Sequence, residues 1–407
     1  MALLVQKFGG TSVADPDRMR DVADYVARTR RRGDDVVVVV SAMGKETDEL
    51  LRLAEAVSGV RPGREMDMLI TAGERKATAL FCMALHDLGV SADSFTGSQA
   101  GFLTDTNHMN AKIVEVRPDR VRQALDDGRV PVIGGSQGVS TERNVTFLGR
   151  GGSDTTAVAL AHALDAEGCE LYTDVSGIFT ADPRVVPSAH KIAHISFDEL
   201  LEMTACGCPK PSMRSVEYAR TWRVPLHVRS SFTWEQGTRV EEEDPSMEQA
   251  IVSAVVHDVS EAKVTIAGVP DKPGIAARVF RALADRDVNV DIIVQNVSEH
   301  GVTDISFTVP KSELAASTEV TEALAGEIGA TGVSTDSAIG RVSLVGAGMK
   351  SNPGVAATMF ETLADAGVNI EMISTSAIRI SCVVAEPEIE RAVQALHDAF
   401  GLEARPE

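Results

Sequence analysis

Two short stretches of the chain combine glycines, hydroxyl residues and single charges in a pattern that could hold phosphate. They are KFGGTS at 7–12 and GRGGSD at 149–154. Glycines leave backbone N–H groups unobstructed and allow positive φ, and the lysine and the arginine add fixed positive charge. In the second stretch, Ser153 or Asp154 could cap a helix over the alanine-rich run that follows. Taken alone, that stretch is equally compatible with a plain turn before a capped helix.

The elements that must position these stretches alternate between strands and helices. Expected strands at 3–8, 35–40, 130–135 and 170–174 end in or run into Gly, Ser, Thr or Asp, and helical patterns lie between them. The valine run at 35–40 is typical of a parallel strand covered on both faces. We therefore expect an α/β fold with an open, mainly parallel sheet and a ligand site at the carboxyl ends of its strands. A Walker A motif is absent from the sequence, so a phosphate grip here is of another kind.

Composition excludes several other functions. The chain has 407 residues, which predicts two or three domains, and a net charge of −20, which argues against nucleic acid or a membrane as partner. Neither a signal peptide nor an apolar run of roughly 18 residues, as a membrane span needs, is present. Five scattered cysteines indicate a reducing cytoplasm, and Cys206 and Cys208 are too close for a zinc motif, so no metal-ligating residue is predicted.

The C-terminal third contains an internal repeat. PGIAARVFRALAD at 273–285 is echoed by PGVAATMFETLAD at 353–365, and VNVDII at 288–293 is echoed at the same offset by VNIEMI at 368–373. Each copy has the order strand, helix, strand, strand, helix, but only the first copy is followed by a candidate last strand. The apolar run at 251–256 is the obvious source of the strand that the second copy lacks. We therefore expect the first repeat to be inserted into the second.

Four motifs in order, followed by these repeats, resemble the aspartate kinases of the amino acid kinase family with paired ACT domains. The motifs are KFGGTS, TAGER at 71–75, GRGGSD and YTDVSG at 172–177. The resemblance covers essentially the whole chain and implies an amino-acid-kinase sheet domain followed by two ACT repeats of βαββαβ type. It also implies transfer of the γ-phosphoryl group of MgATP to the side-chain carboxylate of L-aspartate, with ATP and Mg²⁺ as cofactors. Both reactants are anions, so catalysis would be mostly positioning and charge neutralisation.

The resemblance also implies the site residues. The catalytic residues would be Lys7, Asp154 and Lys210. The residues holding the amino acid would be Ser41, Thr47, Glu74 and Arg150. The nucleotide residues would be Gly9, Gly10, Ser12, Thr173, Asp174, Phe179, Asp182 and Arg184. The residues holding a lysine or threonine effector would be Asp271, Gly274, Gln295, Asn296, Thr375 and Ser376.

Several of these assignments have a simpler alternative. Glu74 could belong to a solvated helix face, and the Asp182 and Arg184 pair could be an exposed turn. Asp154 would organise the cations rather than take a proton, because a carboxylate nucleophile needs no base at pH 7. Arg150 would bind the carboxylate of the amino acid and Glu74 its ammonium group.

The chain departs from the family pattern at the nucleotide end. Pro209 stands where the family usually has a lysine on the ATP phosphates, and Lys210 falls one place later. Two prolines around Lys210 fix φ and remove N–H donors, so this loop cannot keep the usual backbone. Either Lys210 replaces the missing charge or the nucleotide end is impaired. Ala377 stands where the family often has glutamate, which would weaken the effector response.

The expected domains follow from these observations. They are a catalytic domain at 1–232, an acidic linker at 233–250, a first ACT repeat at 262–335, and a second ACT repeat at 251–261 plus 336–407. A homodimer or higher oligomer would form through the ACT repeats. The alternatives are a catalytically weakened amino-acid sensor that keeps the kinase fold, or a paralogue from a specialised pathway with altered regulation.

Overall fold

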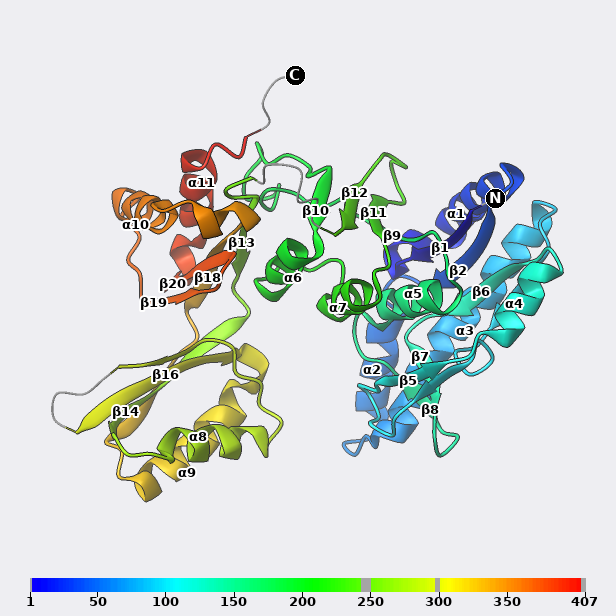
Figure 1. The fold of residues 1–407 in the computed structure, drawn as a ribbon. Helices are drawn as coiled ribbons and strands as arrows, with labels where there is room; N and C mark the ends of the chain where they lie inside the picture. Colours follow the sequence, from blue (N-terminus) through cyan, green and yellow to red (C-terminus); the bar gives the residue numbers. More distant parts are fainter. Residues whose placement is uncertain (1, 243–249, 297–300, 404–407) are drawn as a thin grey trace. The chain divides into compact units, whose positions relative to one another are not determined.

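The computed structural model describes residues 2–242, 250–296 and 301–403, and its chain forms two compact units (Figure 1). The first unit comprises residues 2–178, 191–204 and 209–242. The second unit comprises residues 179–190, 205–208, 250–296 and 301–403. Within these described ranges, no helix combines the length and the apolar composition that crossing a bilayer requires.

An eight-stranded sheet in the order β10-β12-β11-β9-β1-β2-β6-β3 forms the centre of the first unit. Its strands are β1 (Leu3–Phe8), β2 (Asp35–Val40), β3 (Ala92–Phe95), β6 (Val130–Gly134), β9 (Gly168–Thr173), β10 (His194–Ser196), β11 (Leu226–Ser230) and β12 (Thr238–Glu241). The six strands from β11 to β3 run parallel, and β12 runs antiparallel to β11. The expectation of an open, mainly parallel sheet is confirmed.

The register of the central strands determines where the loops emerge. Phe8 pairs with Val40 of β2 on one side and with Tyr172 of β9 on the other, so the three strands end at one level. The valines from Val36 to Val40 are fully buried, as expected for a parallel strand covered on both faces. The turns after β1, β2 and β9 therefore leave the sheet at the same edge, where α/β sheets bind ligands.

Helices flank this sheet and a small second sheet completes the first unit. The helices are α1 (Pro16–Arg31), α2 (Glu46–Val57), α3 (Gly63–Asp87), α4 (Asp119–Asp126), α5 (Gly152–Ala163), α6 (Phe197–Ala205), whose last residue belongs to the second unit, and α7 (Met213–Trp222). The second sheet has the order β5-β4-β7-β8, from β4 (Phe102–Thr104), β5 (Ile113–Val116), β7 (Gln137–Ser140) and β8 (Val145–Phe147). At the start of α1, Asp15 accepts the N–H groups of Asp17 and Arg18, and Pro16 fills the first helical position.

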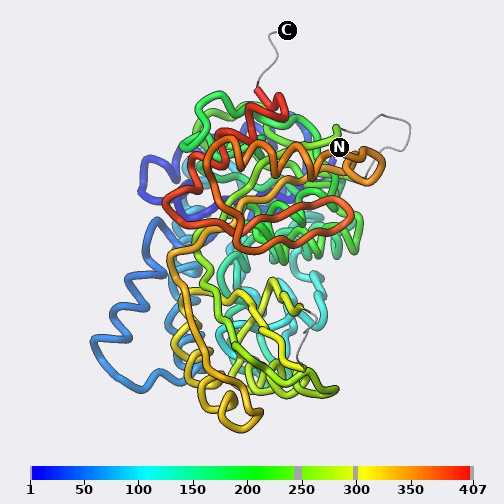
Figure 2. Tube along the Cα trace, turned by 90° about the vertical axis from the view of Figure 1, so that its left-hand side faces the viewer, coloured from blue at the N-terminus to red at the C-terminus, as the bar shows by residue number. Residues whose placement is uncertain are grey.

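The second unit contains two four-stranded antiparallel sheets, one for each repeat. Figure 2 traces the backbone of the first repeat in yellow-green to gold and most of the second in orange to red. The first repeat has the order β15-β16-β14-β17, from β14 (Glu261–Pro270), β15 (Ile293–Gln295), β16 (Val302–Pro310) and β17 (Gly332–Asp336), with α8 (Ile275–Ala284) and α9 (Leu314–Ile328). The second has the order β13-β18-β20-β19, from β13 (Ala254–Asp258), β18 (Ile339–Val345), β19 (Met372–Thr375) and β20 (Arg379–Ala385), with α10 (Val355–Asp365) and α11 (Ile389–Ala399). β13 pairs antiparallel with β18, which is the pairing that an inserted first repeat requires.

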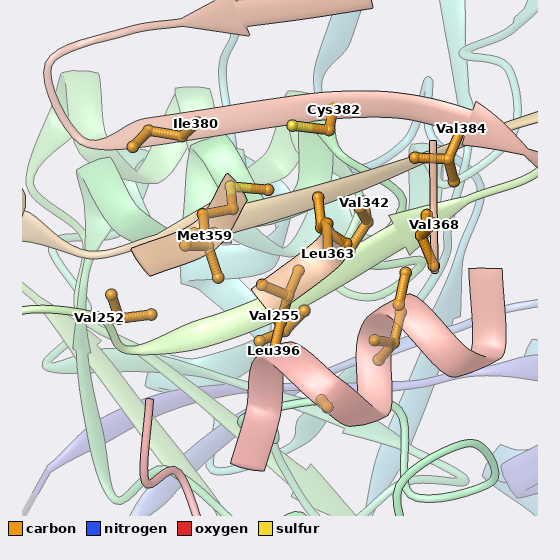
Figure 3. Packing of buried hydrophobic residues seen from close by; sticks show 14 of the residues in the cluster. Val252, Val255, Val342, Met359, Leu363, Val368, Ile380, Cys382, Val384 and Leu396 are labelled. Carbon is orange, nitrogen blue, oxygen red and sulfur yellow. The ribbon is translucent and has the colours of Figure 1, made fainter. Parts of the chain in front are cut away.

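The core of the second repeat lies between its sheet and its two helices (Figure 3). Val342 of β18 and Cys382 of β20 pack in one buried cluster with Met359 and Leu363 of α10 and Leu396 of α11. The spacing of Met359 and Leu363 places both side chains on one face of α10. This is the amphipathic pattern by which the repeat was recognised in the sequence.

Two short segments expected in the catalytic domain belong to the second unit. They are 179–190 and 205–208. Ala181 and Val186 enter the core of the second repeat, and the Val255 amide donates to the Thr180 carbonyl at 2.7 Å. The expected boundary at residue 232 treats the segment from 1 to 232 as one body, whereas the chain enters the second unit twice before that point.

The expected linker also needs correction. Thr238–Glu241 forms β12, with Thr238 and Val240 buried and the alternate residues exposed. The segment looked like a linker because one side of the strand is polar and solvated, which gives an alternating rather than an apolar pattern. Glu243, Asp244 and Pro245 of the predicted linker lie outside the described residues.

Candidate active site

A cavity of about 370 Å³ opens at the carboxyl ends of β1, β2 and β9 in the first unit. It is lined by the turn after β1, the turn after β2, the start of α5, the end of β9 and the loop at 209–212. Ten of the residues predicted for the site line it: Lys7, Gly9, Gly10, Ser41, Thr47, Glu74, Arg150, Asp154, Thr173 and Lys210. The sequence motifs therefore meet at one place although they are far apart in the chain.

Lys7 and Asp154 form a close ion pair at this cavity. The Lys7 Nζ lies 2.5 Å from the Asp154 Oδ1, and both side chains are nearly buried. The second oxygen, Oδ2, accepts the backbone N–H of Ser212 at 3.1 Å. Asp154 therefore holds both the lysine at the end of β1 and the loop at 209–212.

The start of α5 differs from the expectation that Ser153 or Asp154 caps it. The N-cap residue is Gly151, with φ of 73°, and no side chain caps the helix. Asp154 is engaged with Lys7, and the Ser153 hydroxyl bonds the hydroxyls of Ser41 at 3.0 Å and Ser136 at 2.9 Å. Because a helix N-terminus without a side-chain cap keeps its positive end available, this one favours an anion in the cavity.

The turn after β1 has no room for side chains. A Cβ on Gly10 would lie 2.8 Å from the Ala42 carbonyl oxygen and 3.0 Å from that of Gly44. The Gly10 carbonyl in turn accepts the Gly44 N–H at 3.0 Å, which ties this turn to the one after β2. Ser12 lies behind the turn, fully buried, where it accepts a hydrogen bond from Ser231 at 2.8 Å, so it supports the turn and does not line the cavity.

Glu74 is a buried carboxylate at the cavity. Its side chain lies on α3 and the residue is 3% exposed, so the alternative of a solvated face is wrong. A Cβ on the preceding Gly73 would lie 2.9 Å from the Cβ of Ala42, so glycine lets α3 approach the turn after β2 closely. The backbone of Ala42 in that turn forms a hydrogen bond with Glu74. The Glu74 Oε2 is buried and has no hydrogen-bond partner within the described residues. Burial raises the pKa of Glu74 to about 7. A buried carboxylate with an oxygen that lacks a partner is suited to pairing with a cation, which favours its ionised form.

Arg150 extends from the glycine turn before α5. Its side chain is 82% exposed and its Nη2 lies 3.3 Å from the Asp48 Oδ1. An exposed pair at this distance contributes little stability, so Arg150 can leave Asp48 for a stronger partner at small cost. Thr47, beside Asp48, lines the same cavity.

Lys210 reaches the cavity despite the two prolines beside it. Its Nζ lies 2.5 Å from the Asp174 Oδ1, and Thr173 donates to the same oxygen at 2.8 Å. Burial would raise the pKa of Asp174, but the hydrogen bonds from Lys210 and Thr173 outweigh it and hold that pKa below its usual range. Lys210 therefore lies at the cavity, and its role as the charge that Pro209 lacks stays a prediction.

Phe179, Asp182 and Arg184 are not among the residues that line the cavity. They belong to the second unit. Asp182 and Arg184 form an ion pair at 2.6 Å across Pro183, with Arg184 85% exposed, which is the turn that the alternative described. Their assignment to the nucleotide remains a prediction from the resemblance.

The residues predicted to hold an effector in the first repeat lie at one end of its sheet. Asp271 follows β14, and its amide donates at 2.9 Å to the carbonyl just before β16. Gln295 ends β15, and the carbonyl of Asn296 accepts the hydroxyl of Thr303 in β16. Gly274 is the N-cap of α8, with φ of 93°. Asp271 and Asn296 therefore flank the start of β16.

The predicted effector residues of the second repeat lie at the end of β19. Thr375 pairs with Ile380 of β20, and the Ser376 amide donates to the Arg379 carbonyl at 2.8 Å, closing a turn. Ala377 lies exposed in this turn. A glutamate there would have presented its charge to solvent, and this chain has none at that place.

Some groups at the cavity were missed from sequence. Ser153 and Ser212 line it, and the Ser212 backbone amide holds Asp154. Ser153 belongs to a motif that was recognised, but its hydroxyl was given to helix capping. A backbone amide leaves no signal in the sequence, so the contact of Ser212 could not have been found there. Within the part of the chain that the structure describes, no cluster of three or more His, Cys, Asp or Glu side chains could hold a metal ion.

Comparison with known proteins gives family matches over both units. The amino acid kinase family model matches residues 2–230, and the ACT domain model matches 264–323 and 342–400. The aspartokinase of Mycolicibacterium smegmatis is 57% identical over 407 residues, covering 99% of this chain and 97% of that protein. The aspartokinase of Corynebacterium glutamicum is 55% identical over the same shares of the two chains.

Solved structures give the same result. The Escherichia coli aspartokinase III in complex with aspartate and ADP, in its R-state, matches with a TM-score of 0.83 and 26% identity, covering 98% of this chain and 99% of that chain. The same enzyme in complex with lysine and aspartate, in its T-state, matches over the same shares with a TM-score of 0.76 and 26% identity.

Proposed function

The chain belongs to the amino acid kinase family, among its aspartokinases, and from this premise we propose that its cavity transfers the γ-phosphoryl group of ATP to the side-chain carboxylate of L-aspartate. The product is 4-phospho-L-aspartate. The observation that carries the assignment of residues is one cavity that joins Glu74, whose buried Oε2 has no hydrogen-bond partner within the described residues, to the cations Lys7, Arg150 and Lys210. An amino acid and a polyphosphate need this combination of one anion and several cations.

The amino-acid end of the site is formed by Glu74 and Arg150. The α-ammonium group of aspartate pairs with Glu74, whose Oε2 has no partner within the described residues. The α-carboxylate pairs with Arg150, whose fork of N–H donors fits a carboxylate better than its present exposed contact with Asp48. Ser41 and Thr47 assist as neutral hydroxyl groups at the same cavity.

The phosphate end is formed by Lys7, the glycine turn and Lys210. Lys7 neutralises the transferring group, and the turn at Gly9 and Gly10 brings backbone close to it because no side chain intervenes. Lys210 takes the phosphates farther from the acceptor, beside Thr173 and Asp174 at the end of β9. The acceptor is a carboxylate that is already ionised at pH 7, so it attacks the γ-phosphorus without a general base and ADP leaves.

Magnesium would be held mostly by the nucleotide. Mg²⁺ prefers oxygen ligands and usually binds substrate phosphates, water and one or two carboxylates. The acids at the phosphate end are Asp154 and Asp174, each already paired with a lysine, so the chain offers carboxylates but no complete cage. When bound, the metal would neutralise charge on the phosphate oxygens.

The second unit regulates this reaction in our proposal. A lysine or threonine effector would bind at the residues that flank the start of β16, and at the end of β19, between ACT repeats of two chains in a homodimer or higher oligomer. Coupling of this kind is typically worth about 1 to 3 kcal/mol between the two sites. The five cysteines all lie among the described residues and form no disulfide with one another, in keeping with the reducing cytoplasm that the sequence indicates.

A coupled assay of ADP release tests this function. With ATP and Mg²⁺ present, L-aspartate should start ADP release, while L-glutamate and N-acetylglutamate should not. An amino-acid sensor on a kinase scaffold would release no ADP with any of the three, and that result would overturn the proposal.

Replacing Lys210 tests how the loop at 209–212 compensates for Pro209. Lys210→Ala should lower turnover at least about tenfold and raise the KM for ATP, because one cation on the phosphates is lost. Steady-state kinetics measure both, with Lys112→Ala, an exposed lysine outside the cavity, as the control. Kinetics like those of the wild type in Lys210→Ala would remove this residue from the mechanism.

A further inference from the structure

A buried arginine joins several parts of the second unit. Arg341 lies on β18 and is only 2% exposed, although its side chain is long and charged. It is the largest fully buried side chain among the described residues. Its Nη2 lies 3.2 Å from the Glu261 Oε1 and 3.7 Å from the Asp258 Oδ2, and its Nη1 pairs with Asp291. The same Nη2 donates to the main-chain carbonyl of Ala205 at 2.8 Å. Its carboxylate partners therefore come from both repeats. Its carbonyl partner, Ala205, lies outside both repeats in the sequence.

The segment that Arg341 holds contacts the second repeat at three of its four residues. Beside the bond to Ala205, the Arg379 Nη1 contacts the Cys206 Sγ at 3.7 Å. Gly207 has φ of 115°, and a Cβ there would lie 2.3 Å from the carbonyl oxygen of His257 in β13. The backbone at 205–208 therefore packs directly on the second repeat, and glycine is needed for it to do so.

The next four residues line the cavity. Lys210 pairs with Asp174, and the amide of Ser212 donates to Asp154. Prolines on both sides of Lys210 fix φ at two positions, so the chain between 208 and 212 is short and stiff. Residues 205–208 are therefore joined to Lys210 and the Ser212 amide by a short run of chain in which two φ angles are fixed.

Asp174, which pairs with Lys210, has a similar connection to the second unit. Phe179, where the chain enters the second unit, follows Asp174 by five positions. Just beyond it the Thr180 carbonyl accepts the Val255 amide at 2.7 Å, and the Thr180 hydroxyl bonds His397 at 3.0 Å. Both sides of the pair between Asp174 and Lys210 are thus attached by short chain segments to the core of the second repeat.

From these contacts, and resting on the proposed function, we infer that Arg341 is a positioning residue for the phosphate end of the site. By holding the Ala205 carbonyl it places Lys210 and the Ser212 amide, and through Asp291 it ties their placement to the first repeat. Arg341 touches no reactant in this role. It acts through the loop at 209–212.

The variant Arg341→Lys tests this inference in the full-length protein. Lysine keeps a positive charge among the three acids but lacks the fork of donors that reaches Asp291 and Ala205 together. We expect the KM for ATP to rise at least about fivefold and the KM for aspartate to stay within about twofold. Calorimetric titration with a non-hydrolysable ATP analogue should show the same loss of affinity. Ser343 lies on the same strand as Arg341 and shares a buried hydrogen bond with Ser381 of β20. Ser343→Ala, which removes this bond, should change neither value.

The outcomes separate this inference from the proposed function. If the wild type does not bind the ATP analogue, the proposed function fails. If the wild type binds it and folded Arg341→Lys binds it equally well, or if both KM values rise together, the inference fails. Should Arg341→Lys not fold, Arg341→Met with Glu261→Gln removes the arginine together with the most buried of its three carboxylate partners, and the same titration applies. If neither variant folds, Arg341 is a residue of stability only and the inference is overturned.

Discussion

Lys7→Met should lower kcat about a thousandfold while the protein stays folded. Removal of one preorganised donor from developing negative charge costs about 10²–10³ in rate, and Lys7 carries a full charge at a nearly buried position, so the upper end applies. Methionine keeps the length of the side chain at the end of β1. The measurement is the rate of ADP release at saturating ATP and aspartate, with thermal unfolding recorded in parallel.

Lys112→Met is the matched control for this variant, because Lys112 is exposed in the same unit and does not line the cavity. It should leave kcat unchanged. A loss in Lys7→Met of less than tenfold, with an intact fold, would show that Lys7 only balances Asp154 and takes no part in the transfer.

Glu74→Gln should raise the KM for L-aspartate about a hundredfold and leave the KM for ATP nearly unchanged. The substrate ammonium would lose a buried anionic partner, and truncating one side of such a pair typically costs about 2–5 kcal/mol. Glutamine keeps the shape of the side chain, so the change reports charge. Glu65→Gln, on an exposed part of the same helix, is the control and should behave as the wild type.

The pH dependence gives the Glu74 prediction a second readout. Burial raises the pKa of Glu74 to about 7, so the free enzyme loses the carboxylate charge as the pH falls through that value. The bound ammonium favours the ionised form, so the effect should appear in kcat/KM for aspartate and little in kcat. We expect kcat/KM to fall about tenfold from pH 8 to pH 6, and Glu74→Gln to lack this step. A wild-type profile that is flat over this range would contradict the role given to Glu74.

The sheet and most of the cavity could be predicted because their signals are local. The valine strand at 35–40, the glycine turns after β1 and before α5, and the repeat of PGxAA motifs each follow from backbone geometry or periodicity. The sheet then brings together whatever follows parallel strands, so Lys7, Gly10 and Thr173 had to meet at one edge.

The remaining features depend on contacts that only the folded chain supplies. The cap expected from Ser153 or Asp154 is absent because Lys7 and the serines of neighbouring turns compete for those side chains. The membership of residues 179–190 in the second unit could not be predicted, because nothing in their sequence shows that the chain has passed into that unit. The hydrogen bond from Arg341 to Ala205 joins two residues that belong to no shared sequence motif. Its acceptor is a main-chain carbonyl, which every residue has, so the sequence does not mark it.

The identity of the phosphorylated product tests the central claim most directly. Hydroxylamine added to the reaction of the full-length protein with ATP, Mg²⁺ and L-aspartate should trap the acyl phosphate as aspartate β-hydroxamate, in amounts equal to the ADP released. The same reaction with Glu74→Gln should give this product only at much higher aspartate concentration. Release of ADP without hydroxamate, or an equal yield of hydroxamate from L-glutamate, would contradict the assignment of this cavity to the phosphorylation of aspartate.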